Sequence, residues 1–187
     1  MKIAVFGGSF DPPHKGHNAV VMHSLKNLDI DKLIIMPTFI SPFKDKFLAN
    51  EKQRLSWIKK IWGSMKKIEI SSFEIDQKKP VPSIISVNHI LKLYTPEKLY
   101  FIIGADHLST LHLWHNYQEL CKKVEFVIAQ RDNIEIPKKF KSLNTQINIS
   151  STLIRTTLEV EEVCDEIKEE VKEYYLKLQK IDTIKIN

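Results

Sequence analysis

Two histidines three residues apart follow a glycine-rich turn near the start of the chain. His14 and His17 belong to the run GGSFDPPHKGH, which directly follows an apolar stretch. Gly7 and Gly8 allow backbone N–H groups to approach an anion closely, because no Cβ stands in the way. A helix that begins just after His14 would bring both rings to its amino terminus, where free N–H groups and the helix dipole attract phosphate. The spacing therefore predicts a phosphate site.

Two further residues shape this turn. Asp11 precedes two prolines and is expected to tie the turn by hydrogen bonding to nearby backbone. Gly16, between the histidines, is expected to let a ligand come close.

Paired histidines also occur in metal sites, but no cysteine or acidic residue at ligand spacing completes a tetrahedral set, so we predict no protein-bound metal. Three more histidines are expected to lie in loops or at the surface: His107, His112 and His115.

A second candidate site lies near the carboxyl end of the chain. Ser150, Ser151 and Thr152 precede an apolar helix start, and Arg155 follows one turn later. Taken alone, the hydroxyl groups equally suit an ordinary helix cap. Hydroxyl groups, a helix amino terminus and a guanidinium together also form a phosphate cradle. Together with the histidine segment, the phosphate cradle is the favoured interpretation.

Several common nucleotide and hydrolase signatures are missing from the sequence. The dinucleotide fingerprint GxGxxG and the Walker pattern GxxxxGK[ST] do not occur, and neither does the GxSxG elbow of hydrolases. The first two absences disfavour an ordinary dinucleotide or P-loop enzyme, and the third disfavours an α/β-hydrolase.

The elements that position these residues alternate between short apolar runs and helical patterns. Asn50 followed by Gln53 resembles a capping box, and Ser83 is expected to cap a later helix. The predicted strands are 2–6, 32–36, 67–70, 98–103, 123–129 and 146–149, and the predicted helices begin near residues 15, 51 and 83.

This alternation predicts a Rossmann-like, doubly wound α/β fold with a mainly parallel sheet and C-terminal helices. Ligands of such sheets bind beyond the carboxyl ends of the strands, which is where the first glycine-rich turn falls. Near the end of the chain, apolar residues recur at helical spacing over 160–178, which predicts one helix packed against the core.

Length and composition suit one domain. The 187 residues are 43% hydrophobic and 27% charged, which excludes collagen-like and disordered chains. We expect residues 1–187 to form one unit, with an α/β core at 1–149 and a helical segment at 150–187 that completes the site. No membrane-spanning run or signal sequence is evident, so a cytoplasmic protein is expected. Cys121 and Cys164 are expected to be buried thiols.

The charge favours an anionic ligand. The net charge is +5, yet residues 159–173 contain eight acidic residues and two lysines, so the rest of the chain carries +11. A basic body fits a nucleotide or a nucleic acid, although a solvated lysine-rich surface has the same composition.

The two motifs in this order resemble the HxGH nucleotidyltransferase superfamily, most closely the bacterial nicotinate-nucleotide adenylyltransferase family. The runs that carry the resemblance are GGSFDPPHKGH, FIIGADHL, LWHNY and ISSTLIR, which extend over most of the chain. Pantetheine-phosphate adenylyltransferases usually have threonine where His14 stands, and archaeal relatives usually have a GRFQP-like turn. Membership implies transfer of AMP from ATP to nicotinate mononucleotide, with Mg²⁺ carried by the ATP phosphates.

The resemblance also implies roles for individual residues. Catalysis falls to His14, His17 and Arg155. The ATP-binding residues implied are Gly7, Gly8, Ser9, Phe10, Gly16, Gly104, Asp106, Ser150 and Thr152, and those for the mononucleotide are Lys44, Trp114 and Arg131. Two segments on the nicotinate side, 41–44 and 82–85, depart from the usual family pattern.

Three hypotheses remain open on the sequence. The first is the nicotinate enzyme, with ATP and nicotinate mononucleotide as partners and neither nucleic acid nor membrane involved. The second is an adenylyltransferase for another acceptor, nicotinamide mononucleotide or phosphopantetheine. The third is a nucleic-acid-binding module, which no RRM, KH, helix-turn-helix or zinc-finger signature supports. A homo-oligomer is also left open.

Overall fold

A single parallel sheet organises the chain. A computed structural model describes residues 1–40, 47–131, 134–145 and 149–184, with side chains up to residue 181. Within these residues the sheet has six strands in the order β3-β2-β1-β4-β5-β6, and every neighbouring pair is parallel. The strands are β1 (Lys2–Gly8), β2 (Lys32–Pro37), β3 (Ile68–Ile70), β4 (Lys98–Gly104), β5 (Glu125–Ala129) and β6 (Lys141–Leu143).

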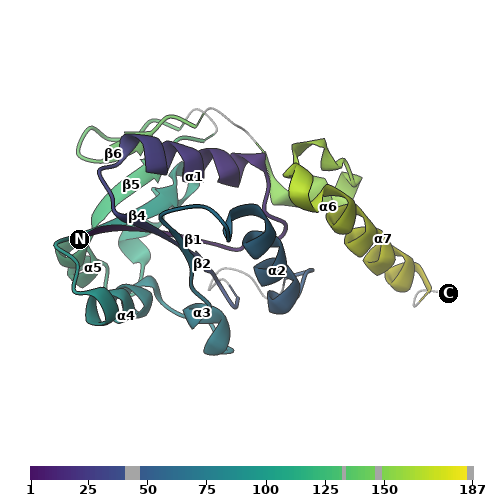
Figure 1. Ribbon diagram of the computed structural model, residues 1–187, viewed down its shortest axis with the longest axis horizontal. Helices are drawn as coiled ribbons and strands as arrows, with labels where there is room; N and C mark the ends of the chain where they lie inside the picture. Colours follow the sequence, from purple (N-terminus) through teal and green to yellow (C-terminus); the bar gives the residue numbers. More distant parts are fainter. Residues whose placement is uncertain (41–46, 132–133, 146–148, 185–187) are drawn as a thin grey trace.

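Helices cover both faces of this sheet, as Figure 1 shows. Alternate residues of β1 point to opposite faces, so Ala4 and Phe6 join the apolar cluster with α1 and α2, whereas Ile3 and Val5 join the cluster with α4 and α5. The Rossmann-like, doubly wound prediction is confirmed. The helices are α1 (Lys15–Asn27), α2 (Glu51–Trp62), α3 (Phe73–Asp76), α4 (Ser83–Tyr94), α5 (Tyr117–Lys123), α6 (Ser151–Thr157) and α7 (Lys168–Ile184).

The strand order makes the ends of β1 and β4 a topological switch point. The chain leaves β1 toward β2 on one side and leaves β4 toward β5 on the other, so the connections diverge where these two strands end. Such a switch point is where open α/β sheets bind ligands. Gly8 and Gly104 end the two strands, which places both glycine turns at this switch point.

The C-terminal stripe is core-facing, as predicted, but it is not one helix. Short 3-10 turns at Val160–Glu162 and Asp165–Ile167 precede α7. Between the turns Val163 and Cys164 have extended backbones, and both side chains are buried.

Some local predictions need correction. The strand predicted over 146–149 falls largely on residues outside the described part, and the sixth strand lies earlier, at β6. Only one of its three residues is buried, so it has no apolar pattern to detect. Asn50 caps α2 by accepting from the Gln53 N–H at 2.9 Å, whereas the cap position of α4 is Pro82 rather than Ser83. Cys164 is buried, but Cys121 is exposed. No helix among the described residues is long and apolar enough to cross a membrane.

Glu74 of α3 is a buried acid whose ionisation should influence stability. Burial raises its pKa from 4.5 to about 7, although a hydrogen bond from the Ser86 hydroxyl at 2.5 Å opposes the shift. Because the folded pKa exceeds the unfolded one, the stabilisation is complete below about pH 4.5 and is lost as the pH rises toward 7. Glu74→Gln should remove this loss and make the protein more stable than wild type at pH 8, by up to about 3 kcal/mol.

Urea denaturation at pH 5 and pH 8 measures this effect. Glu135→Gln is the matched control, because that side chain is exposed. A Glu74→Gln variant whose free energy of unfolding keeps the wild-type pH dependence would show that Glu74 does not carry the raised pKa.

Candidate active site

His14 and His17 form a reciprocal cap at the start of α1. His14 is the cap residue, and its Nδ1 accepts from the His17 backbone N–H at 3.4 Å. In return, the His14 backbone N–H donates to His17 Nδ1 at 3.2 Å. The ring centroids lie 3.8 Å apart. The pair predicted from sequence is therefore one rigid unit at a helix amino terminus, where an anion is favoured.

These bonds fix the tautomers of both rings. An Nδ1 atom that accepts a hydrogen bond carries no proton, so each neutral ring holds its proton on Nε2. Burial, with a further contribution from the charge of Arg131, lowers the pKa of His14 from 6.5 to about 3. His14 thus offers a neutral Nε2–H donor near neutral pH.

We expect His14 to stay neutral between pH 5 and pH 8. Its depressed pKa means that the associated stabilisation is complete above about pH 6.5 and is lost as the pH falls toward 3. Two-bond ¹H–¹⁵N spectra of the imidazoles should show the Nε2–H tautomer of His14 unchanged from pH 8 down to pH 5. Protonation of His14 between pH 6 and 7 would contradict its burial.

Gly16 makes room for the ring of His14. A Cβ at this position would lie 2.9 Å from His14 Cε1 and 3.0 Å from His14 Nδ1. Since His14 is buried, its ring has little space to move. The lack of a side chain at Gly16 therefore lets the His14 ring fold back over the helix, and its expected approach to a ligand stays a prediction.

Gly16→Ala should accordingly lower activity without lowering stability. The methyl group displaces His14, and a misplacement of this size should reduce kcat roughly 10- to 100-fold. Alanine also favours a helix over glycine by about 1 kcal/mol, so the melting temperature should hold or rise. Lys26→Ala, on the exposed side of α1, is the control. Wild-type kcat in Gly16→Ala would show that His14 does not need its present position.

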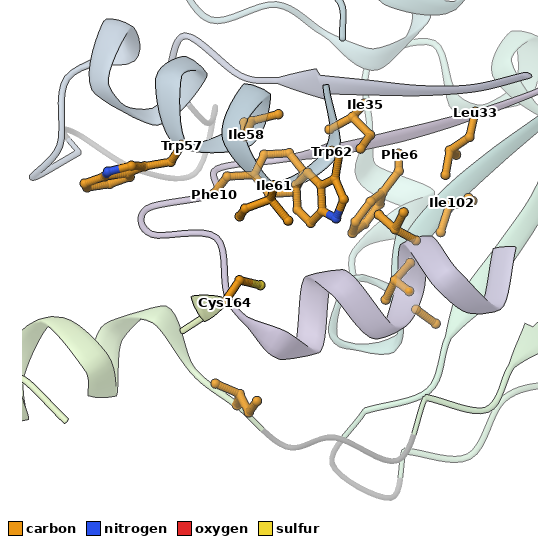
Figure 2. Packing of buried hydrophobic residues seen from close by; sticks show 14 of the residues in the cluster. Phe6, Phe10, Leu33, Ile35, Trp57, Ile58, Ile61, Trp62, Ile102 and Cys164 are labelled. Atoms are coloured by element: carbon orange, nitrogen blue, oxygen red, sulfur yellow. The ribbon is translucent and has the colours of Figure 1, made fainter. Parts of the chain in front are cut away.

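The glycine turn offers a ligand its backbone groups rather than side chains. Gly7 and Gly8 are the last two residues of β1, and Thr38 donates its N–H to the Gly8 carbonyl at 3.0 Å. Phe10, which was expected to line the nucleotide site, has a fully buried side chain. Its ring lies 4.9 Å from the His17 ring and 5.9 Å from Trp62, and Figure 2 shows it in the core. The Phe10 ring therefore packs against the His17 ring from the side of the core.

The two predicted phosphate segments meet. Arg155 of α6 donates through NH1 to the Asp11 carbonyl and lies 3.7 Å from the Asp11 carboxylate. Its NH2 donates to the Thr152 hydroxyl at 3.0 Å. Ser151 donates to the Pro12 carbonyl at 3.0 Å, whereas Ser150 occupies the cap position without a side-chain capping bond. The guanidinium of Arg155 thus lies beside the turn that carries the histidines.

Asp11 ties together more than its own turn. Its buried carboxylate accepts from the Leu48 N–H at 3.1 Å, the Ala49 N–H at 3.0 Å and the Tyr175 hydroxyl at 2.7 Å. Burial and the neighbouring Asp11 raise the pKa of Tyr175, so its hydroxyl remains a donor. The sequence indicated a local tie, but the carboxylate in fact anchors α7 and the chain entering α2.

A second group forms where β4 ends. The absent Cβ of Gly104 would lie 2.3 Å from Asp106 Oδ1, so this glycine lets the Asp106 carboxylate fold back over the strand end. Arg131 NH1 lies 3.8 Å from Asp106 Oδ2, and its NH2 donates to the Ile149 carbonyl at 3.2 Å. The structure therefore brings Arg131 to Asp106 and the histidine side, among residues expected to bind ATP rather than the mononucleotide.

The residues expected to bind the mononucleotide are described only in part. Trp114 is partly buried, with its ring 5.7 Å from His107 and 6.5 Å from Phe101. Its indole N–H is buried and has no hydrogen-bond partner in the described protein. Lys44 and the segment 41–44 lie outside the described residues.

Sequence reasoning missed a buried arginine. Arg54 is fully buried on α2, where it donates to the carbonyls of Ser9, Phe39 and Ala49. One signal was present, because Arg54 occupies an apolar position of the helix, three residues before Trp57 and four before Ile58. An arginine in such a stripe indicates either a snorkelling side chain or a buried guanidinium with partners.

A parallel sheet with a histidine cap and an arginine at its switch point defines a nucleotide-binding α/β protein. The chain belongs to the Cytidylyltransferase-like family, whose profile matches residues 5–157. A solved structure titled Plasmodium falciparum nicotinic acid mononucleotide adenylyltransferase complexed with NaAD is similar, with a TM-score of 0.72, 23% identity and 97% of each chain covered. A second, titled a putative nicotinate-nucleotide adenylyltransferase from Vibrio parahaemolyticus, has a TM-score of 0.69 at 19% identity and covers 91% of this chain and 99% of its own. At these identities the likeness shows the fold alone.

Proteins of similar sequence identify a more specific family. A Campylobacter jejuni protein named "Probable nicotinate-nucleotide adenylyltransferase" is 63% identical over 180 residues, which cover 96% of this chain and 99% of the relative. A Campylobacter fetus protein of the same name is 49% identical, with 94% of this chain and 97% of the relative covered. The chain therefore belongs to the nicotinate-nucleotide adenylyltransferase family, as its motifs indicated.

Proposed function

We propose that the protein transfers the adenylyl group of ATP to nicotinate mononucleotide, giving deamido-NAD and pyrophosphate. The observation that carries this proposal is the contact of Arg155 with Asp11, which joins the hydroxyl-rich segment to the histidine turn. Donors from two distant parts of the chain then lie next to each other, as a bound triphosphate requires. We treat residues 1–187 as one domain, in which the segment 150–187 completes the site.

The substrate itself supplies the nucleophile. The phosphate of the mononucleotide is largely dianionic at pH 7, because the second pKa of a phosphate monoester is about 6. One of its oxygens forms a bond to the α-phosphorus of ATP while the bond from that phosphorus to the bridging oxygen breaks. The electron pair leaves with pyrophosphate, so no side-chain base is needed. Catalysis rests on placing two anions in line and on stabilising the charge of the transition state.

The site residues divide this work by position. We assign the Nε2–H groups of His14 and His17 to the phosphate at which transfer occurs, and Arg155 with Ser150 and Thr152 to the β- and γ-phosphates. Gly104 and Asp106 are assigned to the ribose of ATP, where a carboxylate suits hydroxyl donors. Backbone groups of the turn that contact the nucleotide are those of Gly7, Gly8, Ser9, Phe10 and Gly16.

The mononucleotide side is assigned by position and by family resemblance. Trp114 is assigned to stacking on the nicotinate ring, since an aromatic face suits a flat heterocycle. Lys44 is assigned to the mononucleotide phosphate. Arg131 lies beside Asp106, which is assigned to ATP. It would therefore contact the mononucleotide phosphate only if that phosphate lies next to the bound ATP.

We propose that Mg²⁺ arrives on the ATP phosphates. Within the described part of the chain, no group of three or more histidine, cysteine, aspartate or glutamate side chains is arranged to hold a metal ion. The Asp11 carboxylate is engaged by several donors already. Mg²⁺ commonly binds through substrate phosphates and water, and it would neutralise part of the triphosphate charge.

A comparison of acceptors tests the proposal. Pyrophosphate release from ATP should be fastest with nicotinate mononucleotide and much slower with nicotinamide mononucleotide or phosphopantetheine. Preference for either of the other two acceptors would support an adenylyltransferase of different specificity. Salt-sensitive binding of RNA or DNA that ATP does not compete would instead favour a nucleic-acid-binding module.

A further inference from the structure

Arg54 is a buried cation whose partners are backbone carbonyls. Its side chain is fully buried, and its guanidinium lies 4.3 Å from the centre of the Phe47 ring. NH1 donates to the Ser9 carbonyl at 2.6 Å, NH2 to the Phe39 carbonyl at 3.0 Å, and Nε to the Ala49 carbonyl at 3.2 Å. Arginine is almost never fully buried unless its charge is compensated, because removing a charge from water is costly.

The charge around Arg54 agrees with this arrangement. Burial lowers its pKa, and the negative charges of Asp11 and Glu51 oppose that shift. Asp11 is the buried carboxylate that accepts from Leu48 and Ala49, so the two opposite charges lie in the same part of the core. An apolar residue would fill this space without the desolvation cost, so three specific hydrogen bonds need an explanation beyond packing.

The Ser9 carbonyl that Arg54 holds precedes a strained residue. Phe10 has φ = 50°, in the left-handed region that a bulky side chain rarely adopts. Such a conformation costs roughly 1–3 kcal/mol and persists only when surrounding contacts impose it. Arg54 fixes the peptide on one side of Phe10, and the hydrogen bonds to Asp11 fix the residue on the other side.

The strained residue in turn supports a histidine. The Phe10 ring lies 4.9 Å from the His17 ring and 5.5 Å from the Phe6 ring. A Phe10 residue that relaxed to negative φ would swing its ring away from this place. The geometry of His17 therefore depends on the bend at Ser9 and Phe10, and that bend depends on Arg54.

The other two bonds join this bend to the neighbouring chain. Phe39 follows the end of β2, and Ala49 comes just before the cap of α2. One guanidinium thus connects the turn after β1 to the exit from β2 and to the entrance of α2. A lysine at this position has no planar fork and would not hold three carbonyls in fixed directions.

We infer that Arg54 is a positioning residue for adenylyl transfer, whose guanidinium holds the Ser9–Phe10 bend that sets the place of His17. The inference rests on the proposed function, and it assigns Arg54 no contact with substrate. A purely structural role predicts loss of stability alone. A positioning role predicts loss of turnover in protein that is still folded.

The first test separates kcat from KM. Arg54→Met fills the space without hydrogen bonds, and Arg54→Lys keeps the charge with fewer of them. In folded protein, Arg54→Met should lower kcat roughly 100-fold while KM for ATP changes far less, because the misplaced group acts in the transition state. Arg54→Lys should recover only part of this loss. Lys59→Met, on the exposed side of α2, should behave as wild type.

The second test does not depend on the reaction. Two-bond ¹H–¹⁵N spectra report the ring environment of His17, which should shift in Arg54→Lys and remain unchanged in Lys59→Met. If Arg54 variants do not fold, Phe47→Ala removes the ring that lies over the guanidinium, so that water can compete for its three hydrogen bonds and weaken its hold on the Ser9 carbonyl. That variant should then show a smaller kcat loss and a smaller His17 shift.

The outcomes are distinct. Wild-type kcat and an unchanged His17 signal in folded Arg54→Met, or in Phe47→Ala if it is needed, would overturn the inference. If the wild-type protein transfers no adenylyl group but the His17 signal still moves in Arg54→Lys, the proposed function fails and the positioning of His17 by Arg54 stands.

Discussion

Replacing His17 with alanine should lower kcat roughly 10²- to 10³-fold, equivalent to about 3–4 kcal/mol of transition-state stabilisation. The Nε2–H of this ring is a pre-organised donor, because its Nδ1 is held by the His14 backbone N–H at 3.2 Å and its face rests on Phe10. Such a donor gains most when charge builds up on the reacting phosphate, so kcat should fall more than the affinity for ATP.

Steady-state kinetics with ATP and nicotinate mononucleotide, alongside thermal denaturation, measure this effect. The stability loss should be small, about 1 kcal/mol, since the variant removes one side of a helix cap. His23→Ala is the control on the same helix, six residues further along. Near-normal turnover by folded His17→Ala would remove His17 from the mechanism.

Much of the fold follows from short apolar runs that end at glycine. β1, β2 and β4 are buried on both faces, so their residues form nearly unbroken apolar runs, and Gly8 and Gly104 mark where the strands end. These runs do not predict that β1 and β4 are neighbours, which makes their ends a switch point, because strand order depends on long-range pairing. β6 was not predicted, because only Leu143 of its residues is buried and no alternation of apolar residues marks the strand.

The site was predictable as far as local spacing determines it. His14 and His17 lie on one helix turn, so their meeting needs no long-range information. The inward place of Phe10 depends on a positive φ, and its burial beneath α2 depends on packing that no local pattern expresses. The partners of Arg54 come from three separate segments, so spacing gives only its unusual place in an apolar stripe.

Asp11→Asn should be the most destabilising conservative change in the site. The carboxylate accepts from Leu48, Ala49 and Tyr175 and lies 3.7 Å from an Arg155 nitrogen. An amide has one oxygen, so its NH₂ group must face an N–H or O–H donor in either orientation. The loss of one buried hydrogen bond together with a buried charge pair should cost about 3 kcal/mol.

The free energy of unfolding in urea measures this cost, with Tyr175→Phe as the graded control. That control removes one hydroxyl donor and leaves the carboxylate with its other partners, so it should cost only about 1 kcal/mol. Equal losses in the two variants would mean that the Asp11 charge is not what holds these segments. A larger loss in Asp11→Asn would follow from the missing carboxylate charge, which lies 3.7 Å from Arg155. In the protein that remains folded, kcat should fall only modestly, because Arg155 keeps its hydrogen bond to the Asp11 backbone carbonyl, and that bond still joins the two phosphate segments.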